Sequence, residues 1–204
     1  RLMPYFSPQE CARLHTCFLK DIAGQCQKTQ ADLYICYTPD DKGAALKTIF
    51  GDDKIYFPQM GESLGERMYM AIQRVLAKDY ESCVLIGTDV PEIKQADLDY
   101  AFRLLDVHDV VLGPTHDGGY YLVGMKKPVR EVFEKQTYSH ASVLENTAKA
   151  AFEAGYTVGF ARTLHDIDEK EDICKVRNRM RKNQALQKSE TGRYLLKKQK
   201  ISII

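Results

Sequence analysis

The chain has 204 residues, of which 44% are hydrophobic and 28% are charged, and its formal net charge is +1. This length and composition allow one domain with a sizeable core. The sequence contains neither the roughly 20 consecutive apolar residues of a membrane-spanning helix nor a signal-peptide pattern, so we expect a cytoplasmic protein. The six cysteines show no Cys-x-x-Cys spacing, which argues against zinc ligands and a disulfide framework.

The charges are unevenly distributed along the chain. Residues 175–204 carry ten of the 29 Lys and Arg residues but only one of the 28 acidic residues, which leaves 19 basic and 27 acidic residues before them. A basic terminal segment can bind nucleic acid or a membrane surface, but a solvated helix is the commoner explanation. We therefore predict a domain over residues 1–174 and a basic helical extension over residues 175–204, and we do not expect nucleic-acid binding.

Hydrophobic periodicity predicts strands that alternate with helices along the chain. The predicted helices cover residues 8–22, 42–50, 59–78, 96–105 and 139–153, with a last helix from about residue 169. The predicted strands cover residues 32–37, 55–58, 83–89, 109–114, 120–125 and 157–162. This alternation is typical of an α/β fold with a mostly parallel sheet flanked by helices on both faces.

The first candidate site residue ends an apolar strand. The run Cys-Val-Leu-Ile-Gly-Thr-Asp closes on Asp89, and Pro91 then makes the chain leave the sheet because proline cannot continue a strand ladder. In open α/β sheets ligands bind beyond the carboxyl ends of the strands, where a carboxylate can hold a metal ion and a phosphorylated ligand. The alternative is that Asp89 caps a helix near Lys94 or stabilises its own turn.

A second acidic stretch follows the last predicted strand, where Asp166 and Asp168 precede a helix. Taken alone, Asp168 is better interpreted as the N-cap of that helix, with Glu171 completing a capping box. If the fold brings either carboxylate beside Asp89, two such charges about 4 Å apart repel by about 4 kcal/mol at an effective dielectric near 20. A cation or a shared proton would offset this repulsion, and oxygen ligands with open positions suit Mg²⁺ or Mn²⁺.

The third candidate is the turn between two apolar strands. Asp117-Gly118 between apolar runs is a strong hairpin signal, and the pair Gly118-Gly119 permits positive φ and close approach of a ligand to the backbone. Tyr120 and the tyrosine after it are expected to point to opposite faces of the strand. Asp117 could act as a base or contact an acceptor, whereas a surface role is the stronger interpretation of His116.

Four motifs in order carry a resemblance to a known family. They are Gln-x-Gly-x-x-Leu-Gly-Glu-Arg-Met from Gln59, Gly-Thr-Asp-x-Pro from Gly87, Gly-Pro-x-x-Asp-Gly-Gly-Tyr-Tyr-Leu-x-Gly from Gly113, and Asp-x-Asp-x-x-Glu-Asp from Asp166. The chain resembles the bacterial glycosyltransferase-like proteins of the nucleotide-diphospho-sugar transferase superfamily, which have the Rossmann-like GT-A fold. The resemblance covers most of the chain.

The resemblance implies that Asp89 and Asp168 bind a divalent metal, Mg²⁺ or Mn²⁺, which joins them to the diphosphate of a nucleotide or nucleotide-sugar. Arg1 and Arg67 are candidate phosphate contacts, although a structural pairing of Arg67 with Glu62, Glu66 or a neighbouring helix is slightly favoured. The family's first strand and glycine-rich loop, with base and phosphate contacts, are expected to precede Arg1.

Around the turn, the resemblance places Asp117 as the candidate catalytic residue and Gly118, Gly119 and Tyr120 at the substrate. One departure from the family pattern is Tyr138, which stands where many members have Trp, and we expect this change to be structural.

The expected activity is transfer of a sugar from a nucleotide-diphospho-sugar donor by a metal-dependent glycosyltransferase. A nucleotidyltransferase of the guanylyl- or cytidylyltransferase type is the alternative, because those enzymes share this fold and the pair of metal-binding carboxylates. A non-catalytic protein is disfavoured, since clustered acids are costly to bury without a metal ion.

Overall fold

The computed structural model describes residues 2–3, 5–134, 136–138 and 140–198. Its main sheet has four strands in the order β3-β5-β4-β6. They are β3 (Cys83–Ile86), β4 (Val110–Pro114), β5 (Tyr120–Met125) and β6 (Val158–Phe160).

Strand directions in this sheet follow from one hairpin. β5 runs antiparallel to both β3 and β4, whereas β4 and β6 are parallel. Three of the four strands therefore share one direction, and their carboxyl ends point to the same edge. The predicted hairpin after β4 is confirmed, and it explains why β5 is reversed in a sheet predicted to be mostly parallel.

A second sheet contains β1 (Tyr34–Tyr37) and β2 (Ile55–Pro58), which pair in parallel. The connection between them is the 3₁₀ turn η1 (Asp40–Lys42) followed by helix α2 (Gly43–Phe50). Helix α1 (Pro8–Cys26) and α2 pack together with these strands around Leu19, Ile35 and Phe50. The strand expected before Arg1 stays a prediction.

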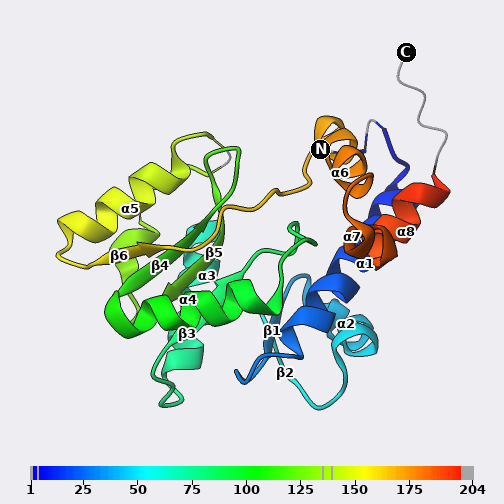
Figure 1. Ribbon diagram of the computed structural model, residues 1–204. Helices are drawn as coiled ribbons and strands as arrows, with labels where there is room; N and C mark the ends of the chain where they lie inside the picture. The colour runs from blue at the N-terminus through cyan, green and yellow to red at the C-terminus, as the bar shows by residue number, and fades with distance from the viewer. Residues whose placement is uncertain (1, 4, 135, 139, 199–204) are drawn as a thin grey trace.

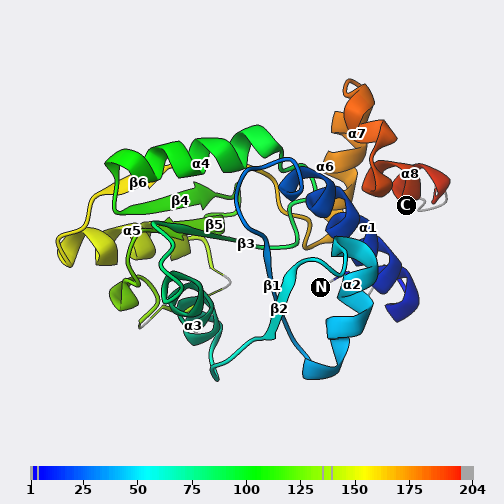
Figure 2. The same cartoon turned by 90° about the horizontal axis from the view of Figure 1, so that it is seen from below.

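Helices cover both faces of the main sheet, as predicted. Helix α4 (Gln95–Val107) lies on one face, and α3 (Leu64–Leu76) and α5 (Val143–Glu153) lie on the other, where the 3₁₀ turn η2 (Arg130–Val132) contacts α5 (Figure 2). Because strand side chains alternate between faces, Val111 packs in the α4 core, whereas Val110 and Leu112 pack in the opposite core. These two apolar layers bury β4 from Val110 to Gly113, whereas Pro114 at its end is partly exposed.

Within the described residues, which end at Lys198, the basic C-terminal segment is helical but is not the solvated appendage that its composition predicted. Helices α6 (Lys170–Met180), α7 (Gln184–Lys188) and α8 (Glu190–Lys197) gather around α1 at one end of the molecule (Figure 1). Their apolar faces form a core of their own with α1, in which Leu186 and Leu195 are buried. The tail has few apolar residues, but Val176, Met180, Leu186 and Leu195 are all buried in this core, which the charge count conceals.

The element boundaries also differ from the predictions at the site. Strand β3 ends at Ile86 instead of Asp89, because Gly87 begins the turn out of the sheet. Helix α3 begins at Leu64 instead of near Gln59, because Ser63 caps it in a capping box with Glu66. Among the described residues, no helix is both long and apolar enough to span a membrane.

Candidate active site

Asp89 lies beyond the carboxyl end of β3, at the edge of the main sheet. It does not cap α4, because the Lys94 backbone N–H donates to Asp97 Oδ2 at 2.8 Å instead. The Gly87 backbone N–H donates to the carbonyl of Tyr121 on β5 at 2.8 Å. A Cβ atom on Gly87 would lie 2.9 Å from Asp89 Oδ1, so the glycine leaves room for this carboxylate.

The second acidic stretch lies directly against Asp89. The Ile167 backbone N–H donates to the Asp89 carbonyl at 2.9 Å, which joins the two loops at the sheet edge. Ile167 is buried in the core between α1 and α6, and its neighbours Asp166 and Asp168 both line the cavity beside Asp89. An alternating extended segment explains this arrangement, because every second side chain points the same way.

The predicted capping role of Asp168 is wrong. Helix α6 is capped by Asp172, whose Oδ2 accepts the backbone N–H groups of Glu169 at 3.0 Å and Asp168 at 3.2 Å. The Asp168 carboxylate is therefore not needed to cap the helix, and its side chain lines the cavity. The acidic run does contain a residue that caps the helix, but that residue is Asp172 instead of Asp168.

An ion pair also joins helix α6 to the loop that carries Asp89. Arg179 on α6 donates through Nε to Glu92 Oε1 at 3.0 Å, and its terminal nitrogen binds the same oxygen. Glu92 follows Asp89 by three residues, so this pair fixes the position of α6 relative to the Asp89 loop. A charged pair that is mostly shielded from solvent and bidentate is more geometrically specific than an exposed ion pair.

The hairpin turn presents Asp117 in a fixed orientation. Asp117 Oδ1 accepts two hydrogen bonds, from the Thr115 hydroxyl at 2.5 Å and from the Gly119 backbone N–H at 3.0 Å. Gly118 has φ +91°, and a Cβ atom there would lie 2.0 Å from the carbonyl oxygen of Ala141. Gly118 is thus required by the turn and by its packing against the segment before α5, while Gly119 lines the cavity.

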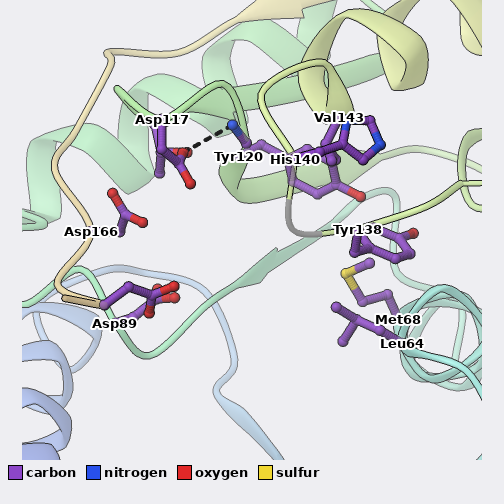
Figure 3. A pocket seen from close by; sticks show the side chains of 12 residues that line it. Leu64, Met68, Asp89, Asp117, Tyr120, Tyr138, His140, Val143 and Asp166 are labelled. Atoms are coloured by element: carbon purple, nitrogen blue, oxygen red, sulfur yellow. Dashed lines mark hydrogen bonds between the residues drawn. The ribbon is translucent and has the colours of Figure 1, made fainter. Parts of the chain in front are cut away.

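These elements enclose one cavity of about 160 Å³ with two chemically different ends (Figure 3). Four carboxylates lie at one end, those of Asp89, Asp117, Asp166 and Asp168. The other end is apolar and aromatic, and it is lined by Leu64, Met68, Tyr120, Tyr138, His140 and Val143. Ligand pockets commonly measure about 300–1,000 Å³, so this partly open space accommodates one part of a ligand, and the rest can extend toward solvent.

The carboxylates at the acidic end repel one another. Burial, followed by the nearby Asp168 and Asp117 carboxylates, raises the pKa of Asp89. Burial and then Asp117 raise the pKa of Asp166 to about 6. Neither Lys nor Arg occurs among the described residues that line this cavity. A cation near Asp89 and Asp166 would favour the ionised form of both carboxylates.

The donor set suits Mg²⁺ or Mn²⁺ bound together with a ligand. Among the described residues, no group of three or more His, Cys, Asp or Glu side chains is arranged to hold a metal ion by itself. Zinc and calcium sites commonly need such protein cages, whereas Mg²⁺ is usually held by one or two carboxylates, waters and substrate phosphates. Asp89 with Asp168 or Asp166 fits that second pattern.

The predicted phosphate contact Arg67 does not line the cavity. Arg67 donates through Nε to the carbonyl of Gly61 at 3.0 Å, so it fixes the loop before α3. A structural role was the favoured prediction for Arg67, but its partner is not Glu62 or Glu66. The Glu66 carboxylate instead accepts the backbone N–H groups of Glu62 and Ser63. Arg1 lies outside the described residues.

Some residues around the cavity were not predicted as site residues from the sequence. Thr115 orients Asp117, and only its place two residues before an Asp-Gly pair could have indicated this role. His116 and His165 stack with ring centroids 3.9 Å apart and so join the Asp117 and Asp166 segments. Tyr138 lines the cavity from a long loop, where no periodic pattern could have predicted its contacts.

A protein-family model matches residues 22–140 of the chain. The family is described as "Uncharacterized protein conserved in bacteria (DUF2064)". The chain belongs to this family.

Solved structures extend the similarity beyond the matched region of the family. A crystal structure of a candidate nucleotide-diphospho-sugar transferase from Desulfovibrio desulfuricans G20 matches with a TM-score of 0.89 and 30% identity, over 98% of this chain and 87% of that chain. CMP:2-keto-3-deoxy-manno-octonic acid synthetase, solved with CTP, matches with a TM-score of 0.54 and 10% identity, over 81% of this chain and 88% of that chain. At that identity the second match shows a shared fold alone. No curated protein matches the chain significantly.

The predicted membership in a bacterial family similar to nucleotide-diphospho-sugar transferases is thereby confirmed, as is the Rossmann-like α/β fold. The same similarity supports the expectation of a transferase.

Proposed function

We propose that this protein is a metal-dependent transferase that moves a sugar from a nucleotide-diphospho-sugar donor to an acceptor. The observation that carries the proposal is the cavity in which the carboxylates of Asp89, Asp117 and Asp166 meet and raise the pKa values of Asp89 and Asp166, with Asp168 also in its lining. A diphosphate is itself anionic and would be repelled by these carboxylates. It binds there only together with a cation. The raised pKa values of Asp89 and Asp166 also favour cation binding, because a cation would stabilise the ionised form of both carboxylates.

Asp89 and Asp168 would hold Mg²⁺ or Mn²⁺, with Asp166 beside them. When bound, the ion would neutralise charge that develops on the leaving diphosphate. The contribution of the chain is preorganisation: the bond from Ile167 to Asp89 and the Arg179–Glu92 pair keep the carboxylates in place before a ligand arrives.

Asp117 would contact the acceptor on the opposite wall of the acidic end. Its Oδ1 is held by Thr115 and Gly119, so its other oxygen is oriented for an incoming hydroxyl group. In this role Asp117 accepts the acceptor proton as the new glycosidic bond forms. Gly119 lines the cavity without a side chain, which lets the ligand approach the backbone.

The reaction class is tested by identifying the leaving group. Purified protein is incubated with Mg²⁺ and either UDP-glucose and GDP-mannose or the nucleoside triphosphates, with cell metabolite extract as the source of acceptor. Released nucleoside diphosphate and pyrophosphate are then quantified. The proposal predicts release of UDP or GDP that stops with EDTA and in Asp89→Asn.

Two other results would contradict the proposal. Pyrophosphate released from a triphosphate, without nucleoside diphosphate from either sugar donor, would assign the chain to the nucleotidyltransferases. Release that Asp89→Asn leaves unchanged would remove the acidic cavity as the site. Asp106→Asn, at an exposed position on α4, is the matched control and should retain wild-type activity.

A further inference from the structure

Strand β6 is the outer edge of the main sheet. Among the described residues it pairs with β4 alone, because the strand order is β3-β5-β4-β6. The opposite edge, β3, faces other parts of the molecule: the Tyr34 hydroxyl on β1 donates to the Tyr80 hydroxyl just before β3 at 3.2 Å. β6 instead borders the outside of the molecule, next to the ends of α4 and α5 (Figure 1, Figure 2).

The backbone groups of β6 alternate between β4 and the open side. The Thr157 carbonyl accepts the Val110 N–H at 3.0 Å, and the Ala161 N–H donates to the same strand at 2.8 Å. The odd-numbered residues of this segment therefore bond to β4, and the N–H and C=O groups of Val158 and Phe160 point to the open side. Neither a charged residue nor a proline, two common protections of an edge strand, occurs from Thr157 to Ala161.

Large apolar side chains are exposed around this edge. Phe152 in the last turn of α5 is 75% exposed, Val107 at the end of α4 is 72% exposed, and Phe160 on β6 is 49% exposed. Both helices pack on β6, and Phe152 and Val107 are the two most exposed large apolar side chains of the described residues. Grouped apolar side chains on a surface mark an interaction site.

We propose that β6 pairs with β6 of a second copy of this chain, antiparallel across a twofold axis through Gly159. Val158 then lies opposite the partner's Phe160, and the two residues exchange both of their hydrogen bonds. The symmetric pair does the same, so every N–H and C=O group that points to the open side has a partner. Each chain offers one such edge, and the pairing therefore closes at a dimer.

The charges on α5 are complementary across the same axis. Lys149 and Glu153 are exposed and lie 3.7 Å apart, and a short turn returns the chain from α5 to β6 in the opposite direction (Figure 1). Four helical residues span about 6 Å and two strand residues span about 7 Å. Glu153 thus lies level with Val158 and Lys149 with Phe160, and the axis brings Lys149 opposite the partner's Glu153.

Sedimentation equilibrium of the whole chain tests the dimer. The proposal predicts a mass of twice 23.3 kDa at about 100 μM protein, because interfaces of standard size bind with micromolar or lower Kd values. A monomer at that concentration would overturn it.

Phe152→Glu and Phe160→Glu locate the interface. Both positions are exposed, so folding should change little, whereas the buried charge should weaken the dimer about tenfold or more. The matched control is Leu196→Glu on α8, at a position that is 44% exposed, and it should dimerise as wild type does. A dimer that both phenylalanine variants leave unchanged would overturn pairing at β6.

Lys149→Glu and Glu153→Lys test the twofold arrangement. Each substitution places like charges at both positions, so each variant alone should dimerise about tenfold more weakly than wild type. A mixture of the two variants pairs opposite charges across the axis and should form a mixed dimer with nearly wild-type affinity. A mixture as weak as the separate variants would overturn the axis through Gly159. None of these interface residues lines the acidic cavity, so the outcome is independent of the proposed activity.

Discussion

At the scale of single residues, the site depends on how each carboxylate is held. Asp117 is fixed by Thr115 and Gly119, while the Asp89 backbone is fixed by Ile167. The sequence indicated Asp89 and Asp117 from their places at the end of a strand and in a turn, whereas the metal-binding role of Asp168 came only from the family resemblance. It could not predict which acids share one cavity, because that depends on the crossing of segments about 80 residues apart. Asp166 was weighed only as a possibility for this reason.

Gly87→Ala tests whether the position of the Asp89 carboxylate matters. The new Cβ would lie 2.9 Å from Asp89 Oδ1, a mobile end of a side chain that can move aside at little cost to folding. We expect a melting temperature near that of wild type and a loss of Mg²⁺-dependent nucleotide affinity of about tenfold or more, since small misplacements weaken positioned contacts strongly. Differential scanning fluorimetry and calorimetry measure the two quantities.

The matched control is Gly24→Ala on α1, where a Cβ atom would meet nothing within 4 Å. Alanine there should stabilise the helix by up to about 1 kcal/mol and leave binding unchanged. Equal binding by Gly87→Ala and Gly24→Ala would show that the Asp89 carboxylate is not a ligand.

Asp166→Asn tests the electrostatic strain at the acidic end. Because burial and Asp117 raise the pKa of Asp166 to about 6, the native state retains a proton that the unfolded chain releases near pH 4. Stability should therefore fall as the pH rises from about 4 to about 6 and stay lower above that range. With a discount for its partial exposure, Asp166→Asn should raise the free energy of unfolding at pH 7 by about 1 kcal/mol.

The measurement is urea unfolding in EDTA at several pH values between 4 and 8, for wild type and Asp166→Asn. The variant should show a smaller fall in stability across the range. A variant that is less stable than wild type at pH 7 would mean that the Asp166 carboxylate is satisfied within the protein, contrary to the strained cavity described above.

At the scale of elements, the sequence predicted the strands and helices of the α/β core well because each carries clear apolar periodicity. Strands β2 and β5 were predicted with their observed bounds, and the hairpin before β5 followed from Asp117-Gly118. The boundaries at the site were less predictable, because capping by Ser63 and Asp172 depends on side chains that compete with several neighbouring polar residues. The basic tail was misjudged because its charges outnumber the few apolar residues that anchor it.

Leu195→Ala tests whether helix α8 belongs to the folded body. Leu195 is 1% exposed in the core with α1, so its truncation should lower the free energy of unfolding by about 2–4 kcal/mol. The neighbouring Leu196 is 44% exposed, and Leu196→Ala should change stability by less than about 0.5 kcal/mol. Urea unfolding measures the free energy of unfolding of both variants. Equally small effects of Leu195→Ala and Leu196→Ala would show that the tail is a solvated appendage.

At the scale of the whole molecule, the site joins two parts of the fold. Asp89 and Asp117 come from the edge of the main sheet, whereas Asp168 immediately precedes α6, which packs on α1 with the other C-terminal helices (Figure 1). The packing of this helical end is therefore coupled to the position of one carboxylate. The family match and the similarity to a solved relative over 98% of the chain agree with this arrangement as a shared fold.

The most direct test of the central claim is the binding of UDP and GDP to the whole chain by calorimetry, with Mg²⁺, with Mn²⁺ and with EDTA. The account predicts binding of at least one nucleoside diphosphate that requires the cation and is lost in Asp89→Asn but kept in Asp106→Asn. Binding that is equally tight in EDTA, or that survives in Asp89→Asn, would contradict a cation-bridged diphosphate at the acidic cavity.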